Sequence, residues 1–90
     1  MKEVILKTGE KVLIVEGNIS PDGIHKLYVE VIITAVYPKK LIDNISPKEF
    51  ARMKRELKKK ALAELKELGY MISDKPYVEV NISSPSNNRK

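Results

Sequence analysis

Apolar and polar positions along this chain follow two different periods. Up to position 37, β-branched and other apolar residues come in three runs, at positions 2–7, 11–17 and 24–37, and turn residues separate the runs. Such runs are typical of β-strands. Positions 45–70 have the period of an α-helix, and a short alternating run at positions 77–82 predicts a fourth strand. The order β-β-β-α-β predicts an α+β fold, in which an antiparallel meander carries one long helix on one face.

The ends of the long helix are encoded locally. Ser46 is a good N-cap, and Pro47 suits the first helical position, where its missing N–H costs nothing. Glu49 lies three residues after Ser46 and completes a capping box. Gly69 can take the left-handed conformation that closes a helix. The sequence therefore predicts a helix from Pro47 to Leu68.

One side of this helix is apolar. At 100° per residue, six residues fall on one stripe: Phe50, Met53, Leu57, Ala61, Leu65 and Leu68. We expect this stripe to cover one face of the sheet.

Two turns assign the strand residues to faces. A two-residue turn at positions 9–10 and a three-residue turn at positions 21–23 would fix the pairing of the first three strands, and directly paired residues share a face. One face is then uncharged and contains Val4, Leu6, Leu13, Val15, Leu27, Val29, Val31, Ile33 and Ala35. The opposite face contains Glu3, Ile5, Lys7, Val12, Ile14, Glu16, Tyr28, Glu30, Ile32 and Thr34.

The second face has no helix to cover it. Five apolar side chains lie there within a ring of charge, at Ile5, Val12, Ile14, Tyr28 and Ile32. Soluble monomers rarely expose a contiguous apolar patch of this size. We therefore expect self-association through this face, most simply as a symmetric homodimer. Two alternatives remain open: the fourth strand or the linker covers this face, or a different protein does.

The opposite side of the helix is basic. Four cations fall within about 60° of one another on the helical wheel, at Arg52, Arg55, Lys59 and Lys66. Such a surface could contact a phosphate backbone. The alternative is an ordinary solvated helix face, since Arg52 and Glu56, and then Glu56 and Lys60, have the i,i+4 spacing of surface ion pairs.

Residues that carry catalysis are scarce. The chain has no cysteine, and His25, at the start of a predicted strand, is its only histidine. A lone histidine, without a cysteine or a second histidine to share a metal ion, does not predict a metal site. No nucleophile–base pair and no glycine-rich phosphate loop occurs. We therefore expect no enzymatic activity, no cofactor, no metal and no small-molecule substrate.

Length and charge predict the number of domains, the location and the kind of source. Ninety residues suffice for one domain, at positions 1–82, with a loose polar tail at positions 83–90. No apolar run is long enough to span a membrane, and no signal peptide is recognisable, so a cytoplasmic location is expected. The net charge is +5, and only three of the 17 basic residues are arginine. This lysine excess is typical of a thermophile or an AT-rich genome.

These observations predict a small non-enzymatic α+β protein that self-associates and acts by binding. The alternative is a basic nucleic-acid-binding protein that uses the outer face of its helix.

Overall fold

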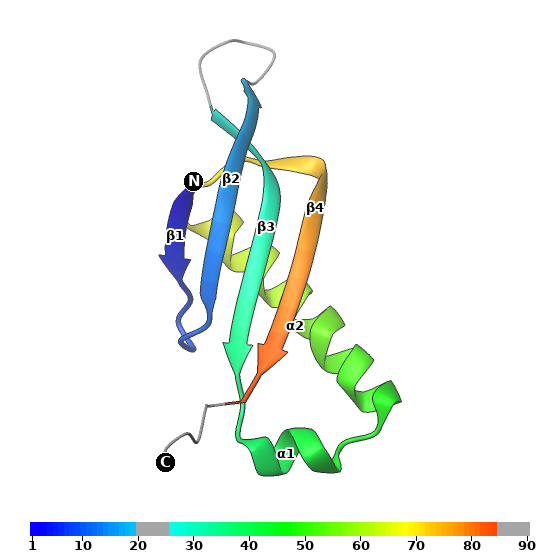
Figure 1. Ribbon diagram of the computed structural model, residues 1–90. Helices are drawn as coiled ribbons and strands as arrows, with labels where there is room; N and C mark the ends of the chain where they lie inside the picture. Colours follow the sequence, from blue (N-terminus) through cyan, green and yellow to red (C-terminus); the bar gives the residue numbers. More distant parts are fainter. Residues whose placement is uncertain (20–25, 85–90) are drawn as a thin grey trace.

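The computed structural model describes residues 1–19 and 26–84, and it has the expected α+β architecture (Figure 1). Its elements are β1 (Lys2–Ile5), β2 (Lys11–Ile19), β3 (Lys26–Val36), α1 (Lys39–Asn44), α2 (Pro47–Glu67) and β4 (Ile72–Ser83). The strands form one sheet in the order β1-β2-β3-β4. The first three strands are antiparallel neighbours, whereas β4 lies parallel to β3. The sheet is therefore mixed, and α2 packs on one of its faces.

The local signals for α2 are confirmed at both ends. Ser46 Oγ accepts a hydrogen bond from the Glu49 N–H at 3.1 Å, and Glu49 Oε1 accepts one from the Ser46 N–H at 3.4 Å. This is the predicted capping box. At the other end Gly69 adopts a φ of 96°, and the Tyr70 N–H donates to the Leu65 carbonyl at 3.1 Å. This bond completes a Schellman motif.

The core lies between the sheet and the C-terminal half of α2. Leu57, Ala61 and Leu65 are buried, as the apolar stripe of the helix predicts. Phe50 and Met53, nearer the start of the helix, are only half-buried. The reason is visible in Figure 1, where α2 crosses behind the sheet obliquely and its N-terminal half extends beyond β4.

The two faces of strand β2 are exchanged relative to the prediction. Val12 and Ile14 are fully buried in the core, so they point toward α2. Side chains alternate along a strand, so Leu13 and Val15 point away from α2. The predicted faces are therefore correct for Val4 and Leu6 but wrong for β2.

The turn between β1 and β2 explains this difference. A two-residue turn at positions 9–10 would pair residue 8 with Lys11, whereas Lys11 pairs with Ile5. The loop is longer than expected, because the Leu6 N–H donates to the Glu10 carbonyl at 2.9 Å while Gly9 adopts a φ of 97°. The change in pairing is an odd number of residues, and an odd shift moves every side chain of a strand to the other face. The second predicted turn, at positions 21–23, lies outside the described residues.

An irregularity in β3 brings Tyr28 into the core. The β3 register with both neighbouring strands shifts near Tyr28, whose ring packs edge-on against Tyr70 at 5.8 Å between centroids. On the other side of the sheet, Val29 lies against Gly17. A Cβ atom added to Gly17 would come within 2.4 Å of Val29 Cγ2. The absence of a side chain at Gly17 thus permits this close approach.

The fourth strand is longer than predicted. Alternation indicates a strand at positions 77–82, but β4 begins five residues earlier, at Ile72. The connection between β3 and α2 contains a short helix, α1, at Lys39–Asn44. In the described part of the chain, neither helix combines the length and the apolar character that a membrane-spanning segment requires. Positions 85–90 of the predicted tail, and His25, lie outside the described residues.

Candidate functional site

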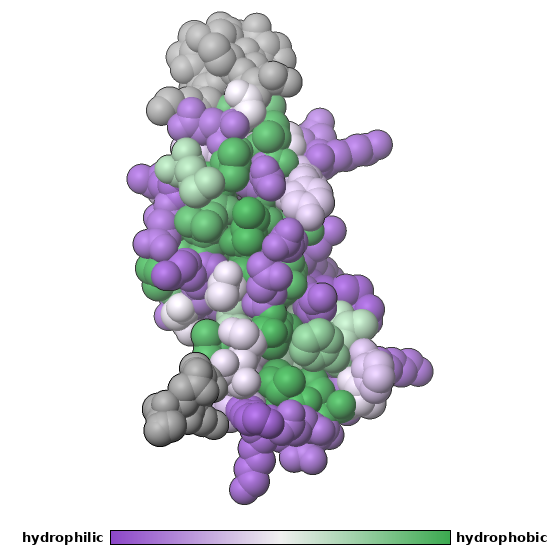
Figure 2. Space-filling view, in the orientation of Figure 1, coloured by the Kyte–Doolittle hydropathy of each residue, from purple (hydrophilic) through white to green (hydrophobic). Residues whose placement is uncertain are grey.

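The sheet face directed away from α2, called here the open face, is built of cross-strand rows. The pairing registers define two complete rows across all four strands: Ile5–Lys11–Thr34–Asn81 and Glu3–Leu13–Ile32–Glu79. A third row contains Val15, Glu30 and Tyr77. Figure 2 shows the molecule from this side, with apolar surface over the middle of the sheet and hydrophilic surface around it. The open face is therefore an apolar strip within a polar rim.

Only two of the five residues predicted for self-association lie on this face. Ile5 is 57% exposed, and Ile32 lies half-buried beside Leu13. Val12, Ile14 and Tyr28 belong to the core beneath α2, so their predicted placement was wrong. The exchange of the two faces of β2 explains the error for Val12 and Ile14. The register shift in β3 explains it for Tyr28.

Sequence reasoning missed the residues that take their places. Leu13 and Val15 occupy the open face in β2, and both are half-buried. Tyr77 was missed as well and is 58% exposed, whereas Val36, which the alternation of the third strand predicts on this face, is 60% exposed. The sequence of β2 contains no signal that separates Leu13 from Ile14, because both phases of the strand are apolar. In the structure, the pairing of Leu13 with Glu3 places it on the open face.

Three charged side chains of the open face, Glu3, Lys11 and Glu79, are paired within the chain. Lys11 Nζ lies 3.4 Å from Glu3 Oε2. The Tyr77 hydroxyl donates to Glu79 Oε1 at 3.1 Å, and Asn81 Nδ2 donates to Glu79 Oε2 at 3.0 Å. The hydrogen bond to Glu79, together with that carboxylate's charge, raises the pKa of Tyr77. These contacts lower the cost of removing the face from water, because a paired charge loses less solvation than an isolated one.

The outer face of α2 carries the four predicted cations, Arg52, Arg55, Lys59 and Lys66, all of them exposed. The surface ion pairs that the solvated-face interpretation predicts are not formed. Among the described residues, no carboxylate lies in an ion pair with any of the four. The positive charge of this face is therefore not neutralised within the described part of the chain.

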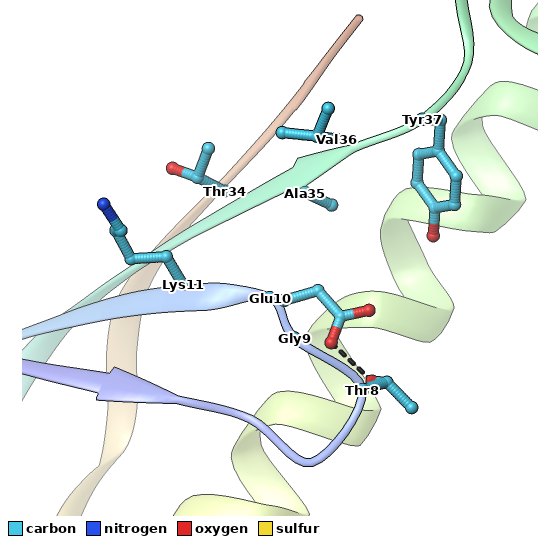
Figure 3. A pocket seen from close by; sticks show the side chains of 8 residues that line it. All are labelled: Thr8, Gly9, Glu10, Lys11, Thr34, Ala35, Val36 and Tyr37. Carbon is cyan, nitrogen blue, oxygen red and sulfur yellow. Dashed lines mark hydrogen bonds between the residues drawn. The ribbon is translucent and has the colours of Figure 1, made fainter. Parts of the chain in front are cut away.

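Lys60 instead anchors the β1–β2 turn. Its Nζ donates to Thr8 Oγ1 and to Glu10 Oε2, the latter at 2.9 Å. Thr8 Oγ1 also donates to Glu10 Oε1, which is the bond drawn in Figure 3. The Lys7 N–H donates to Glu64 Oε2 at 2.7 Å and gives the turn a second attachment to α2. The turn is thus held to the helix by polar contacts.

A pocket of about 380 Å³ opens beside this turn, between residues 8–11 and the end of β3 at positions 34–37. Figure 3 shows Thr34 and Val36 pointing to one side of β3 and Ala35 to the other. Glu10 is the only carboxylate in the lining, and both of its oxygens accept hydrogen bonds from Thr8 and Lys60. A carboxylate held in this way is suited to stabilising the turn rather than to accepting a proton from a substrate.

The Glu10 cluster predicts a stability loss at acid pH. Burial raises the pKa of Glu10, but the hydrogen bonds from Thr8 and Lys60 outweigh burial and leave the pKa below its usual 4.5. Because the folded-state pKa is the lower one, the stabilisation is complete above pH 4.5 and is lost as the pH falls through the folded value. Thermal denaturation of the wild type should therefore show a larger drop in Tm below pH 4.5 than that of Glu10→Gln. Equal pH dependence in the two proteins would contradict this role.

Metal ligation finds no support in residues 1–19 and 26–84, where no group of three or more histidine, aspartate or glutamate side chains is arranged to hold an ion. Comparisons with protein families, with curated proteins and with solved structures found no match to this chain. The geometry supports two surfaces as candidate sites, the open face of the sheet and the basic outer face of α2.

Proposed function

We propose that this protein is a small, non-enzymatic interaction protein that forms a homodimer through the open face. The observation that supports the proposal is the central pair Leu13 and Ile32, which has Val15 beside it. Three charged side chains around the pair, Glu3, Lys11 and Glu79, already have partners within the chain. Apolar side chains surrounded by satisfied polar groups are the usual composition of a protein–protein interface.

A second copy of this chain fits the face better than an unrelated apolar surface would. A two-fold axis running across the strands, between the two complete rows, stacks each row on the other row of the second copy. Asn81 then lies over Glu79 of the second copy, and Lys11 lies near its Glu3. Leu13 and Ile32 of one copy lie over Lys11 and Thr34 of the other, and the methylene groups of Lys11 cover Leu13. Lys11 thus sits between the Glu3 carboxylates of the two copies.

Replacing Ile32 by aspartate should dissociate the dimer without unfolding the subunit. The charge would enter the middle of the interface, but Ile32 points away from α2 and is not part of the core cluster. Light scattering at about 100 μM protein, a concentration that populates a dimer with micromolar Kd, should give a dimer for the wild type and a monomer for Ile32→Asp. The far-UV circular dichroism of the two proteins should agree.

Ala63→Asp is the matched control, because it adds the same charge at an exposed position of α2, remote from the open face. This variant should remain dimeric. A dimeric Ile32→Asp would show that the open face is not the interface.

A second function, binding of nucleic acid by the outer face of α2, is favoured by one observation. The four cations of that face are exposed and make no ion pair with any described carboxylate. Unneutralised cations along one side of a helix can replace the counterions of a phosphate backbone. A dimer joined through the open face would present two such helices.

Four phosphate contacts on duplex DNA should give a salt slope of about −3.6, or a roughly 150-fold loss of affinity between 50 and 200 mM salt. Replacing Arg55 and Lys59 by alanine should flatten the slope by about two units, because two contacts are removed. The control, Lys7→Ala with Lys75→Ala, makes the same change in net charge away from this face and should leave the slope unchanged. Undetectable binding at 50 mM salt would reject this second function.

A further inference from the structure

β4 is the edge strand of the sheet, and α2 passes beside its free edge. Among the described residues β4 pairs only with β3, so one edge of this 12-residue strand has no paired strand. A groove of about 400 Å³ lies along it, lined by residues 77–81 of β4 and by Lys54, Arg55 and Lys58 of α2. We call it the edge groove. Figure 1 shows why it exists, since the N-terminal half of α2 extends past β4.

The face of α2 that borders the groove changes character along the helix. Lys54 lies seven residues before Ala61, and Lys58 lies seven residues before Leu65, so each lysine shares a side of the helix with a buried residue. Where the helix lies under the sheet, this side is apolar and buried. Where the helix extends past β4, the same side is basic. The sequence thus places cations where a further strand would contact the helix.

The charge in the edge groove is predominantly positive. Lys54, Arg55 and Lys58 make no ion pair with any described carboxylate, although Lys54 lies 5.5 Å from the centre of the Phe50 ring. The groove contains one carboxylate, Glu79, and both of its oxygens already accept hydrogen bonds from neighbours in β4. An incoming anionic group would therefore meet three cations.

The edge of β4 itself can accept another strand. An edge strand presents a row of unpaired backbone N–H and C=O groups, and proteins commonly protect such edges with lysine or proline. β4 has that protection only at its start, at Lys75 and Pro76, while positions 77–83 contain neither residue type. The part of the edge that borders the groove is therefore open to strand pairing.

From these observations we propose that the edge groove binds an extended acidic segment of another protein, which adds to β4 as a fifth strand. Backbone hydrogen bonds to β4 would provide affinity, as in other cases of strand addition. Acidic side chains on the helix side of the added strand would meet Lys54, Arg55 and Lys58 and provide specificity. Apolar residues at the alternate positions would extend the open face.

A second copy of this chain is a poor occupant of the groove. A symmetric pairing of two β4 edges brings the same three cations of both copies toward the two-fold axis, and like charges placed together are destabilising. The charge that favours an acidic segment thus disfavours edge-to-edge self-association. This inference does not depend on the proposed dimer, which uses the open face and not the edge of β4, although Tyr77, Glu79 and Asn81 border both surfaces.

The test is the affinity of a fluorescein-labelled peptide of about nine residues with alternating Glu and Val, measured by fluorescence anisotropy at about 0.15 M salt, where the screening length is ~8 Å. Replacing Lys54, Arg55 and Lys58 together by glutamine should weaken binding about 10-fold. The control is the triple replacement of Arg52, Lys59 and Lys66 by glutamine, which removes the same charge from the outer face and should change affinity less than about 2-fold. Measuring both sets in the Ile32→Asp background separates this test from dimerisation.

Strand addition predicts a second, backbone-specific result. The same peptide N-methylated at its interior amides keeps its charge but loses its donors, so it should bind about 10-fold more weakly. Amide resonances of residues 78–82 should shift on binding of the unmethylated peptide. Equal weakening by the two triple replacements, or equal affinity for the methylated peptide, would overturn the proposal. So would displacement of the peptide by a single-stranded oligonucleotide of equal charge at lower concentration, which would identify a nucleic-acid site.

Discussion

Ile14→Asp is expected to unfold the protein, whereas Leu13→Asp, one position earlier in the same strand, is expected to leave it folded. Ile14 is 0% exposed and belongs to the core cluster, so its replacement buries a carboxylate among apolar side chains. Burying a charge without a partner costs several kcal/mol, and the lost apolar burial adds ~2–3 kcal/mol. A 90-residue domain has a total stability of about 5–13 kcal/mol. The substitution is therefore expected to remove most or all of the folding stability.

Far-UV circular dichroism and thermal melting of the two variants measure this directly. Leu13→Asp should keep the helical signal, because its side chain points to the open face, although it should lose the dimer. The reverse result, with Leu13→Asp unfolded and Ile14→Asp folded, would show that Leu13 faces α2, as predicted from the sequence, and would contradict the observed burial of Ile14.

Leu65→Ala should lower the free energy of unfolding by about 2–5 kcal/mol, the usual cost of a large-to-small change at a packed site. Leu65 is 0% exposed in the core between α2 and the sheet, so truncation leaves a cavity there. Leu68, from the same predicted stripe, is 55% exposed at the C-cap of the helix. Leu68→Ala should therefore cost less than about 1 kcal/mol.

Urea denaturation followed by circular dichroism gives both values, at a protein concentration low enough that dimerisation does not contribute. Similar losses for the two variants would mean that the buried part of the apolar stripe continues to the C-cap. That result would contradict the exposed position of Leu68.

The helix could be predicted because its signals are local. The capping box at Ser46 and Glu49 and the glycine at position 69 act within a few residues, and each forms as predicted. The strands of the meander could be predicted for a similar reason, since turn residues interrupt the apolar runs. Local signals fix where an element begins and ends, but they do not fix what it pairs with.

The face of β2 could not be predicted because its sequence is apolar in both phases. Val12 and Ile14 occupy one phase, Leu13 and Val15 the other, and neither pair carries a charge. A shift of one residue therefore carries no penalty in the hydrophobic pattern. The length of the β1–β2 loop, closed by the bond from the Leu6 N–H to the Glu10 carbonyl, determines which face of β2 is buried. No single residue type specifies that length.

The edge groove was also beyond sequence reasoning. It depends on the parallel pairing of β4 with β3 and on the angle at which α2 leaves the sheet, and both are properties of the tertiary structure. The cations of α2 were recognisable as a basic surface. Their division between the outer face of α2 and the groove beside β4 required the position of the fourth strand.

The most direct test of the central proposal, self-association through the open face, is sedimentation velocity of the wild type over a protein concentration series that reaches about 100 μM. The proposal predicts a monomer at the lowest concentrations and a mass near twice the chain mass of 10.2 kDa at the highest, with Ile32→Asp monomeric throughout. A wild type that remains a 10.2 kDa monomer at about 100 μM would contradict it.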